Sequence, residues 1–276
     1  MAASWRIRGV RLIDPYQQID QEGVDIGVAA GKFVSAKDLP ANAQEFDGRG
    51  LWLVPRMVDM HVHFREPGME WKENIVSGSN AAAAGGFSAV SPMANTQPVV
   101  DTPSLIEWQV RRGEQDNMVR LWPIGAVTKN LAGQELADLY LMKTAGAVGF
   151  SDDGRCVQDA RLMRAALSDS VLLKRPVIQH AEDHQWSQGT VMHEGAVSHQ
   201  LGLAGVPAEA ESVIVWRDVQ IAGLTQGYLH VAHISAIGSL DALAYAQERG
   251  WHVSAEAAPH HLFFSDEAVR EWQYNP

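Results

Sequence analysis

The sequence predicts an α/β protein with the (β/α)8 architecture of a TIM-type barrel, preceded by a small β unit. From about residue 56, short apolar runs alternate with helical segments, a pattern typical of a parallel sheet with right-handed crossovers. Seven apolar runs favour a closed barrel over an open doubly wound sheet, and no Gly-x-Gly-x-x-Gly motif follows a strand. We therefore expect two domains, at 1–55 and 56–276.

The first 55 residues have the chemistry of strands and turns. Asp14-Pro15, Gly31 and Asp47-Gly48 interrupt the apolar segments, because proline, glycine and aspartate favour turns. We expect a small β unit here. Its expected strands span 5–13, 23–28 and 32–36.

The barrel segment carries recognisable helix ends. Thr102-Pro103 and Asp159 are expected to begin helices, Ser239 is expected to cap another, and Gly146 and Gly250 follow helix ends. An eighth strand is not found in the sequence. The expected strands span 58–63, 87–91, 119–125, 145–151, 176–180, 227–233 and 251–257. The expected helices span 102–113, 135–145, 159–173, 207–223, 239–249 and 266–272, after a first crossover helix that includes 81–86.

The composition is that of an ordinary globular protein. Of 276 residues, 46% are hydrophobic and 20% are charged, and the formal net charge of -11 argues against nucleic acid or an anionic membrane as partner. A single cysteine, Cys156, excludes an internal disulfide and indicates a reducing compartment. No signal-peptide or membrane-spanning pattern is found, so we expect a soluble, cytoplasmic protein.

The first barrel strand carries ionisable residues at alternate positions. Asp59, His61, His63 and Arg65 share one face, because side chains two apart on a strand point the same way. Two imidazoles about 6 to 7 Å apart suit neighbouring corners of a metal's coordination sphere. The alternative is a pair of hydrogen-bonded core histidines, but ionisable residues on an apolar strand are costly without a shared ligand.

Other polar residues stand at the ends of later strands, where barrel enzymes place their active sites. Histidines and carboxylates together suit zinc or a related divalent ion, and one carboxylate can bridge two such ions. The sequence therefore predicts a metal site at this end of the barrel. Its further candidates are Asn95, Asp152, Asp153, His180 and His233.

Strand parity narrows this set only in part. His230 and His233 face opposite ways on a regular strand, and His233, at the strand end, is the better candidate. Asp152 and Asp153 also alternate, and parity does not decide between them. Three further histidines lie in the connection 182–207 and are expected on the surface or in a loop over the site: His184, His193 and His199.

Arg65 and Asn95 are candidate substrate contacts. An arginine beside a metal site places a bidentate fork where a substrate carboxylate would bind, although an ion pair with Glu66 or Glu70 is the alternative. Asn95 could contact the same carboxylate or serve only to form a turn.

Several segments, taken together, resemble the type I dihydroorotases of the cyclic amidohydrolases, which are metal-dependent hydrolases. The matching segments occur in family order along the chain. They are 61–68 (HVHFREPG), 82–86 (AAAGG), 95–96 (NT), 150–154 (FSDDG), 180–183 (HAED), 233–235 (HIS) and 259–262 (PHHL).

The resemblance implies two zinc ions and a defined set of ligands. It selects Asp153 as the bridging ligand, and Lys143 stands three residues too early to serve as the carboxylated lysine of hydantoinases and allantoinases. Arg65 and Asn95 would contact the carboxylate of dihydroorotate or N-carbamoyl-L-aspartate. The implied reaction is reversible ring closure of carbamoyl aspartate in pyrimidine synthesis, and whether the enzyme forms a homodimer stays open. The implied zinc ligands are His61, His63, Asp153, His180 and His233.

The last residues resemble the start of the family's Asn-Pro-Pro-Leu-Arg loop, in which Asn275 would contact substrate. The resemblance then implies that strand eight, its general acid/base aspartate and the strands completing the β unit are absent from this sequence. Two other readings remain open. One is a non-catalytic homologue that serves as structural partner of aspartate transcarbamoylase, and the other is an allantoinase or another cyclic amidohydrolase.

Overall fold

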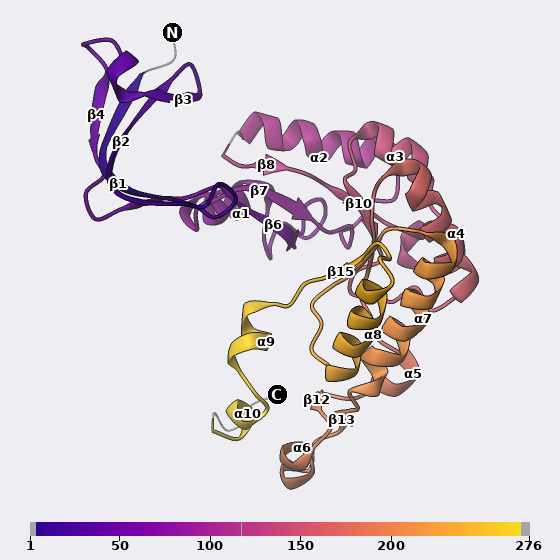
Figure 1. Ribbon diagram of the computed structural model, residues 1–276. Helices are drawn as coiled ribbons and strands as arrows, with labels where there is room; N and C mark the ends of the chain where they lie inside the picture. The colour runs from indigo at the N-terminus through magenta and orange to yellow at the C-terminus, as the bar shows by residue number, and fades with distance from the viewer. Residues whose placement is uncertain (1–3, 117, 272–276) are drawn as a thin grey trace. The chain divides into compact units, whose positions relative to one another are not determined.

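The computed structural model describes residues 4–116 and 118–271. The chain divides into two compact units, Met1–Met57 and Val58–Pro276, which we describe separately (Figure 1). None of the described helices is long and apolar enough to cross a membrane.

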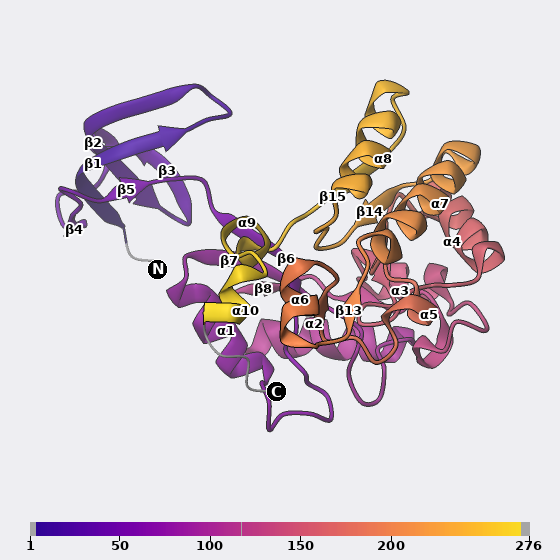
Figure 2. The ribbon, with the colours of Figure 1, turned by 90° about the horizontal axis from the view of Figure 1, so that it is seen from below.

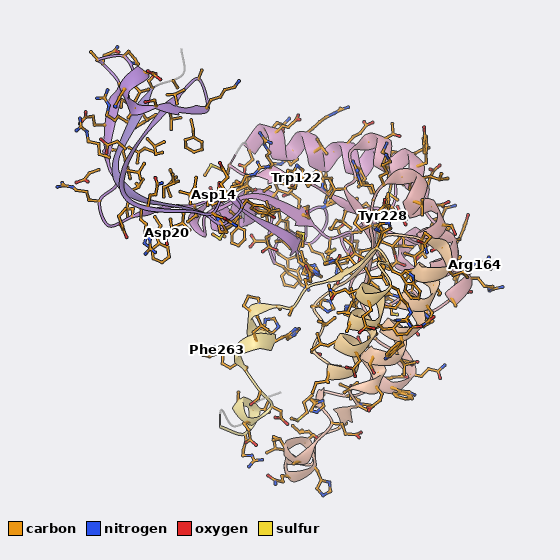
Figure 3. The ribbon with its side chains drawn as sticks, viewed as in Figure 1. Asp14, Asp20, Trp122, Arg164, Tyr228 and Phe263 are labelled. Atoms are coloured by element: carbon orange, nitrogen blue, oxygen red, sulfur yellow. The ribbon has the colours of Figure 1, made fainter. Side chains whose placement is uncertain are left out.

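The first unit is a five-stranded sheet in the order β3-β2-β1-β4, with β5 paired to β1. Strands β1 and β2 form an antiparallel hairpin whose turn begins at Asp14, which accepts hydrogen bonds from Tyr16 N and Gln17 N (Figure 3). Few side chains are buried, and Phe33 and Trp52 are 70% and 67% exposed, so burial contributes little to this unit. The strands are β1 (Trp5–Asp14), β2 (Ile19–Ala29), β3 (Lys32–Ser35), β4 (Gln44–Asp47) and β5 (Trp52–Leu53).

The second unit contains the parallel strands of the predicted barrel. Their order in space follows the chain, in one sheet as β6-β7-β8 and in another as β9-β10-β11-β14-β15, with the helices outside them (Figures 1 and 2). The C-terminal ends of these strands therefore lie on one side. The strands are β6 (Met57–Val62), β7 (Phe87–Pro92), β8 (Arg120–Leu121), β9 (Ile124–Gly125), β10 (Gly149–Ser151), β11 (Val177–Gln179), β14 (Leu229–Val231) and β15 (Val253–Ala255).

The third barrel strand, expected to be continuous over 119–125, is two short strands. Pro123 has no N–H and interrupts the ladder between β8 and β9. On either side, Trp122 N donates to Val90 O and Val148 N donates to Pro123 O, each bond bridging to a neighbouring strand. The chain therefore passes from pairing with β7 to pairing with β10 at this proline.

The helices between the strands begin within two residues of where the sequence places them, except α3, which was expected from 135 and begins at Leu139. Asp159 caps α4 as expected, its carboxylate accepting from Arg161 N. The expectation that Ser239 caps a helix is wrong, because α8 begins at Ile237 and Ser239 lies within it. The helices are α1 (Ile75–Ala84), α2 (Pro103–Asp116), α3 (Leu139–Ala145), α4 (Ala160–Leu173), α7 (Glu209–Thr225), α8 (Ile237–Glu248), α9 (Pro259–Phe263) and α10 (Glu267–Glu271).

The connection before α7 contains short elements where only a loop was expected. Strands β12 and β13 form a small parallel pair. Turns of helix precede and separate them, so the backbone of this connection is largely hydrogen-bonded. The elements are α5 (His184–Ser187), β12 (Met192–His193), α6 (Ala196–Leu201) and β13 (Gly205–Val206).

The main core lies between the sheet and its covering helices. Phe150 on β10 and Met163 and Leu167 on α4 are fully buried in it. Arg164, one position beyond Met163, instead points outward (Figure 3). This helical periodicity packs the helix against the strands that carry the polar residues at their ends.

Candidate metal centre

His61 and His63 stand at the end of β6 and face the same carboxylate, that of Asp153. Nε2 of His61 lies 3.4 Å from Asp153 Oδ1, and Nε2 of His63 lies 3.4 Å from Asp153 Oδ2. The two ring centroids are 5.2 Å apart. The strand parity of residues 61 and 63 thus brings both imidazoles to one carboxylate.

His180 and His233 approach the same carboxylate from β11 and β14. His180 Nδ1 and His233 Nε2 lie 3.6 and 3.4 Å from Asp153 Oδ1, and 3.0 Å from one another. Four imidazoles from three strand ends therefore converge on Asp153. Strands β11 and β14 pair in one parallel sheet and β6 belongs to another, and residues so distant in sequence meet because the C-terminal ends of these strands lie on one side.

The neighbouring aspartates have different surroundings. Asp152 is buried and accepts hydrogen bonds from Val127 N and Thr128 N at 2.8 and 2.9 Å, and from the Thr128 hydroxyl. Burial raises the pKa of Asp152, although these bonds oppose the shift. For Asp153 burial also disfavours the charge, but the surrounding imidazoles outweigh it and hold its pKa well below the usual range. The structure thus directs Asp153, and not Asp152, toward the histidines.

These side chains fit a divalent cation. One ligand atom from each of His61, Asp153 and His233 lies within 4.8 Å of the others. Imidazole nitrogen and carboxylate oxygen are donors that zinc accepts. A buried carboxylate surrounded by imidazole nitrogens is also an arrangement in which a cation would relieve crowding among lone pairs.

The outer nitrogens of three rings have oxygen partners. His61 Nδ1 lies 2.8 Å from Glu256 Oε1, and His63 Nδ1 lies 3.0 Å from Asn95 Oδ1. His180 Nε2 lies 3.0 Å from Glu182 Oε2. Metal-binding histidines commonly donate their second N–H to such oxygens, which fixes the ring and its tautomer.

Asn95 connects the histidines to Arg65. Its Nδ2 lies 3.3 Å from Asp153 Oδ2, while Arg65 Nη1 donates to Asn95 Oδ1 at 3.4 Å. Glu66 and Glu70, the alternative ion-pair partners of Arg65, have other contacts. Glu66 contacts Arg112, and Glu70 accepts a hydrogen bond from Gly68 N. The guanidinium is thus placed beside the histidines.

The turn that carries Arg65 depends on glycine. Arg65 itself has a positive φ of 57°, and Gly68 has a φ of 92°. A Cβ at Gly68 would lie 1.7 Å from Gln97 O. Gln97 N donates to Pro67 O at 3.0 Å, so this close approach fastens the Arg65 turn to the segment that follows Asn95.

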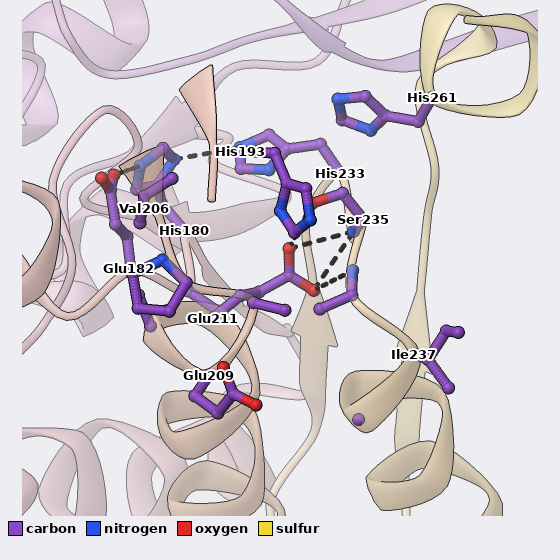
Figure 4. A pocket seen from close by; sticks show the side chains of 16 residues that line it. His180, Glu182, His193, Val206, Glu209, Glu211, His233, Ser235, Ile237 and His261 are labelled. Atoms are coloured by element: carbon purple, nitrogen blue, oxygen red, sulfur yellow. Dashed lines mark hydrogen bonds and ion pairs between the residues drawn. The ribbon is translucent and has the colours of Figure 1, made fainter. Parts of the chain in front are cut away.

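A cavity of about 730 Å³ opens beside His180 and His233. Figure 4 shows residues of the connection before α7, including His193, on its wall. His193, expected on the surface or in a covering loop, therefore lines this cavity. The cavity gives a small molecule access to the imidazoles on this side.

Glu211 on α7 replaces the missing side-chain cap of α8. Its carboxylate accepts hydrogen bonds from Ser235 N, Ala236 N and the hydroxyls of Ser235 and Ser239, at 2.6 to 3.1 Å (Figure 4). The cap residue Ala236 supplies no side-chain bond. Glu211 thereby fixes the loop that follows His233.

Glu211→Ala is expected to lower the free energy of unfolding by about 2 kcal/mol, because several donors at a helix start lose a charged acceptor. Urea denaturation followed by circular dichroism would measure it. Glu209→Ala is the matched control, since Glu209 also lies in the first turn of α7 but is exposed. If both variants lost the same free energy of unfolding, the charge in the first turn of α7, and not the cap of α8, would explain the loss.

The sequence analysis did not assign roles to three carboxylates: Glu182, Glu211 and Glu256. Glu256 could have been found, since it is the only charged residue in the expected strand 251–257 and stands near its end. Glu211 lies within the expected helix 207–223, and no neighbouring motif in the sequence indicates that it caps another helix. Asn275 lies outside the described residues.

Comparison with known proteins identifies the family. A family model described as "Dihydro-orotase-like" matches residues 50–239. Curated relatives called dihydroorotase include those of Geotalea daltonii, 43% identical over 98% of this chain and 64% of the relative, and Pelotomaculum thermopropionicum, 45% identical over 95% and 62%. The chain thus spans somewhat less than two thirds of the length of these relatives.

Solved structures show the same barrel. The L-hydantoinase of Arthrobacter aurescens matches with a TM-score of 0.79 at 22% identity, over 97% of this chain and 61% of that one. The dihydropyrimidinase of Brevibacillus agri matches with a TM-score of 0.72 at 19% identity, over 97% and 60%. These likenesses confirm the predicted TIM-type fold with a small N-terminal β unit. The chain belongs to the dihydroorotase-like family.

Proposed function

We propose that this chain provides the metal-binding part of a cytoplasmic dihydroorotase, which interconverts N-carbamoyl-L-aspartate and dihydroorotate in pyrimidine synthesis. The convergence of four imidazoles on the Asp153 carboxylate carries the proposal. The dihydroorotases among its relatives support the choice of substrate.

Two zinc ions are the proposed cofactors, held by the four histidines with Asp153 as the shared ligand. Both oxygens of Asp153 face imidazole nitrogens, which supports a bridging role. When bound, zinc supplies a Lewis acid that polarises a carbonyl and lowers the pKa of water. The proposed ligands are His61, His63, Asp153, His180 and His233.

Arg65 and Asn95 are the proposed contacts for the substrate carboxylate. The Arg65 guanidinium is half-buried, and its hydrogen bond to Asn95 is long at 3.4 Å, so its fork can turn to a carboxylate. The Oδ1 atom of Asn95 would then keep His63 oriented, while its Nδ2 group faces the substrate anion. Asn275 is proposed as a further substrate contact.

The test compares substrates and metal dependence in the dihydroorotase of which this chain is proposed to form the metal-binding part. Zinc-loaded protein is expected to hydrolyse dihydroorotate in preference to allantoin and hydantoin, and a chelator is expected to abolish the activity. Preference for allantoin would replace the proposed substrate. A chain that binds no zinc but co-migrates with aspartate transcarbamoylase would instead indicate a structural partner protein.

A further inference from the structure

Glu256 is a carboxylate at the end of β15 that contacts imidazoles from two other strands. Its Oε1 lies 2.8 Å from Nδ1 of His61 on β6. Its Oε2 lies 3.5 Å from Nε2 of His230 on β14. The side chain is 19% exposed, so these rings replace much of its contact with water.

The backbone fixes the position of Glu256. Glu256 N donates to Val231 O at 3.0 Å, and Ile234 N donates to Glu256 O at 2.9 Å. The two partners, Val231 and Ile234, lie on either side of His233 in the sequence. Glu256 is therefore held beside the strand end that carries one candidate ligand while it contacts another.

The contact with His61 decides which ring nitrogen carries the proton. A neutral imidazole has one N–H donor and one lone pair, and an ionised carboxylate can only accept. Nδ1 of His61 must therefore carry the hydrogen that Glu256 accepts. The lone pair is then left on Nε2, the nitrogen that faces Asp153.

The second oxygen of Glu256 faces His230. Its Nδ1 lies 2.9 Å from the Ser254 hydroxyl, and its buried Nε2 has no hydrogen-bond partner within the described residues other than this approach to Glu256. His230 and Ser254 are register partners of β14 and β15. Glu256, two positions beyond Ser254, lies on the same face.

We propose that Glu256 is a positioning residue: it holds His61 in the tautomer whose Nε2 lone pair faces the metal site, while its second oxygen faces His230, whose ring contacts Ser254. The inference rests on the metal site of the proposed function. It gives His230 a role, although that histidine is not in the proposed ligand set.

The test measures zinc affinity and the His61 tautomer. Glu256→Ala is expected to weaken zinc binding by about 10- to 100-fold in competition with a chromophoric chelator. Nitrogen-15 NMR of the zinc-free chain, at a pH at which His61 is neutral, should show protonated Nδ1 on His61 in the parent protein and loss of that single tautomer in the variant. Glu256→Gln keeps an acceptor oxygen and should recover part of the affinity.

The controls separate this role from folding. Glu248→Ala removes an exposed carboxylate from α8 and should leave zinc affinity unchanged. Glu256→Leu removes the acceptor while keeping the volume, and it carries the test if Glu256→Ala does not fold. Parental affinity in a variant without the acceptor, or an unchanged His61 tautomer there, overturns the inference. Failure of the parent chain to bind zinc would instead contradict the proposed function itself.

Discussion

Replacing Asp153 with alanine is expected to empty the metal site and slow dihydroorotate hydrolysis roughly 1000-fold, the equivalent of about 4 kcal/mol of electrostatic stabilisation. The reason is geometric: the variant leaves four imidazoles around a position without a negative charge. Two divalent cations held by neutral ligands alone repel one another without a bridging anion. Metal content by mass spectrometry and the initial rate of hydrolysis would measure the two losses.

Asp152→Asn is the matched control for this variant. Asp152 is the adjacent carboxylate, is also buried, and holds the backbone of Val127 and Thr128. Asparagine keeps one acceptor oxygen but loses charge, so we expect reduced thermal stability with metal content retained. Full zinc occupancy in Asp153→Ala, together with metal loss in Asp152→Asn, would exchange the roles assigned to the two residues.

The fold was largely predictable because strand and helix periodicities are local. Each expected strand overlaps an observed one, and Asp159 caps its helix as its side chain predicts. The errors occur where distant residues decide. The start of α8 depends on Glu211, a residue from another helix, so Ser239 was mistaken for a cap. Pro123 divides a strand only because each half pairs with a different neighbour.

The candidate site was predictable in its inner part and not in its surroundings. Parity along β6 brings His61 and His63 together, and the ends of parallel strands bring in the other histidines. Parity did not distinguish Asp152 from Asp153, because the choice depends on hydrogen bonds offered by Val127 and Thr128. The partners of the outer ring nitrogens come from other strands and loops, and no spacing rule connects them to the histidines.

Arg65 can be tested apart from the metal ligands. Its guanidinium lies beside Asn95, and its charge helps to lower the pKa of His63, after the larger effect of burial and against the opposing effect of Asp153. Glu66 and Glu70 are engaged elsewhere, so the arginine is not neutralised by the carboxylates nearest in sequence. A cation held in this way is suited to a substrate anion.

Arg65→Met is expected to raise the KM for dihydroorotate about 100-fold, since a charge-assisted hydrogen bond contributes about 3 kcal/mol to binding. Zinc content should stay the same, because the guanidinium is proposed to contact the substrate and not the ligand atoms. Arg112→Met, which removes an arginine that pairs with Glu66 outside the site, should change neither quantity. Loss of zinc in Arg65→Met would mean that the arginine supports the ligands through Asn95. An unchanged KM would mean that another group binds the carboxylate.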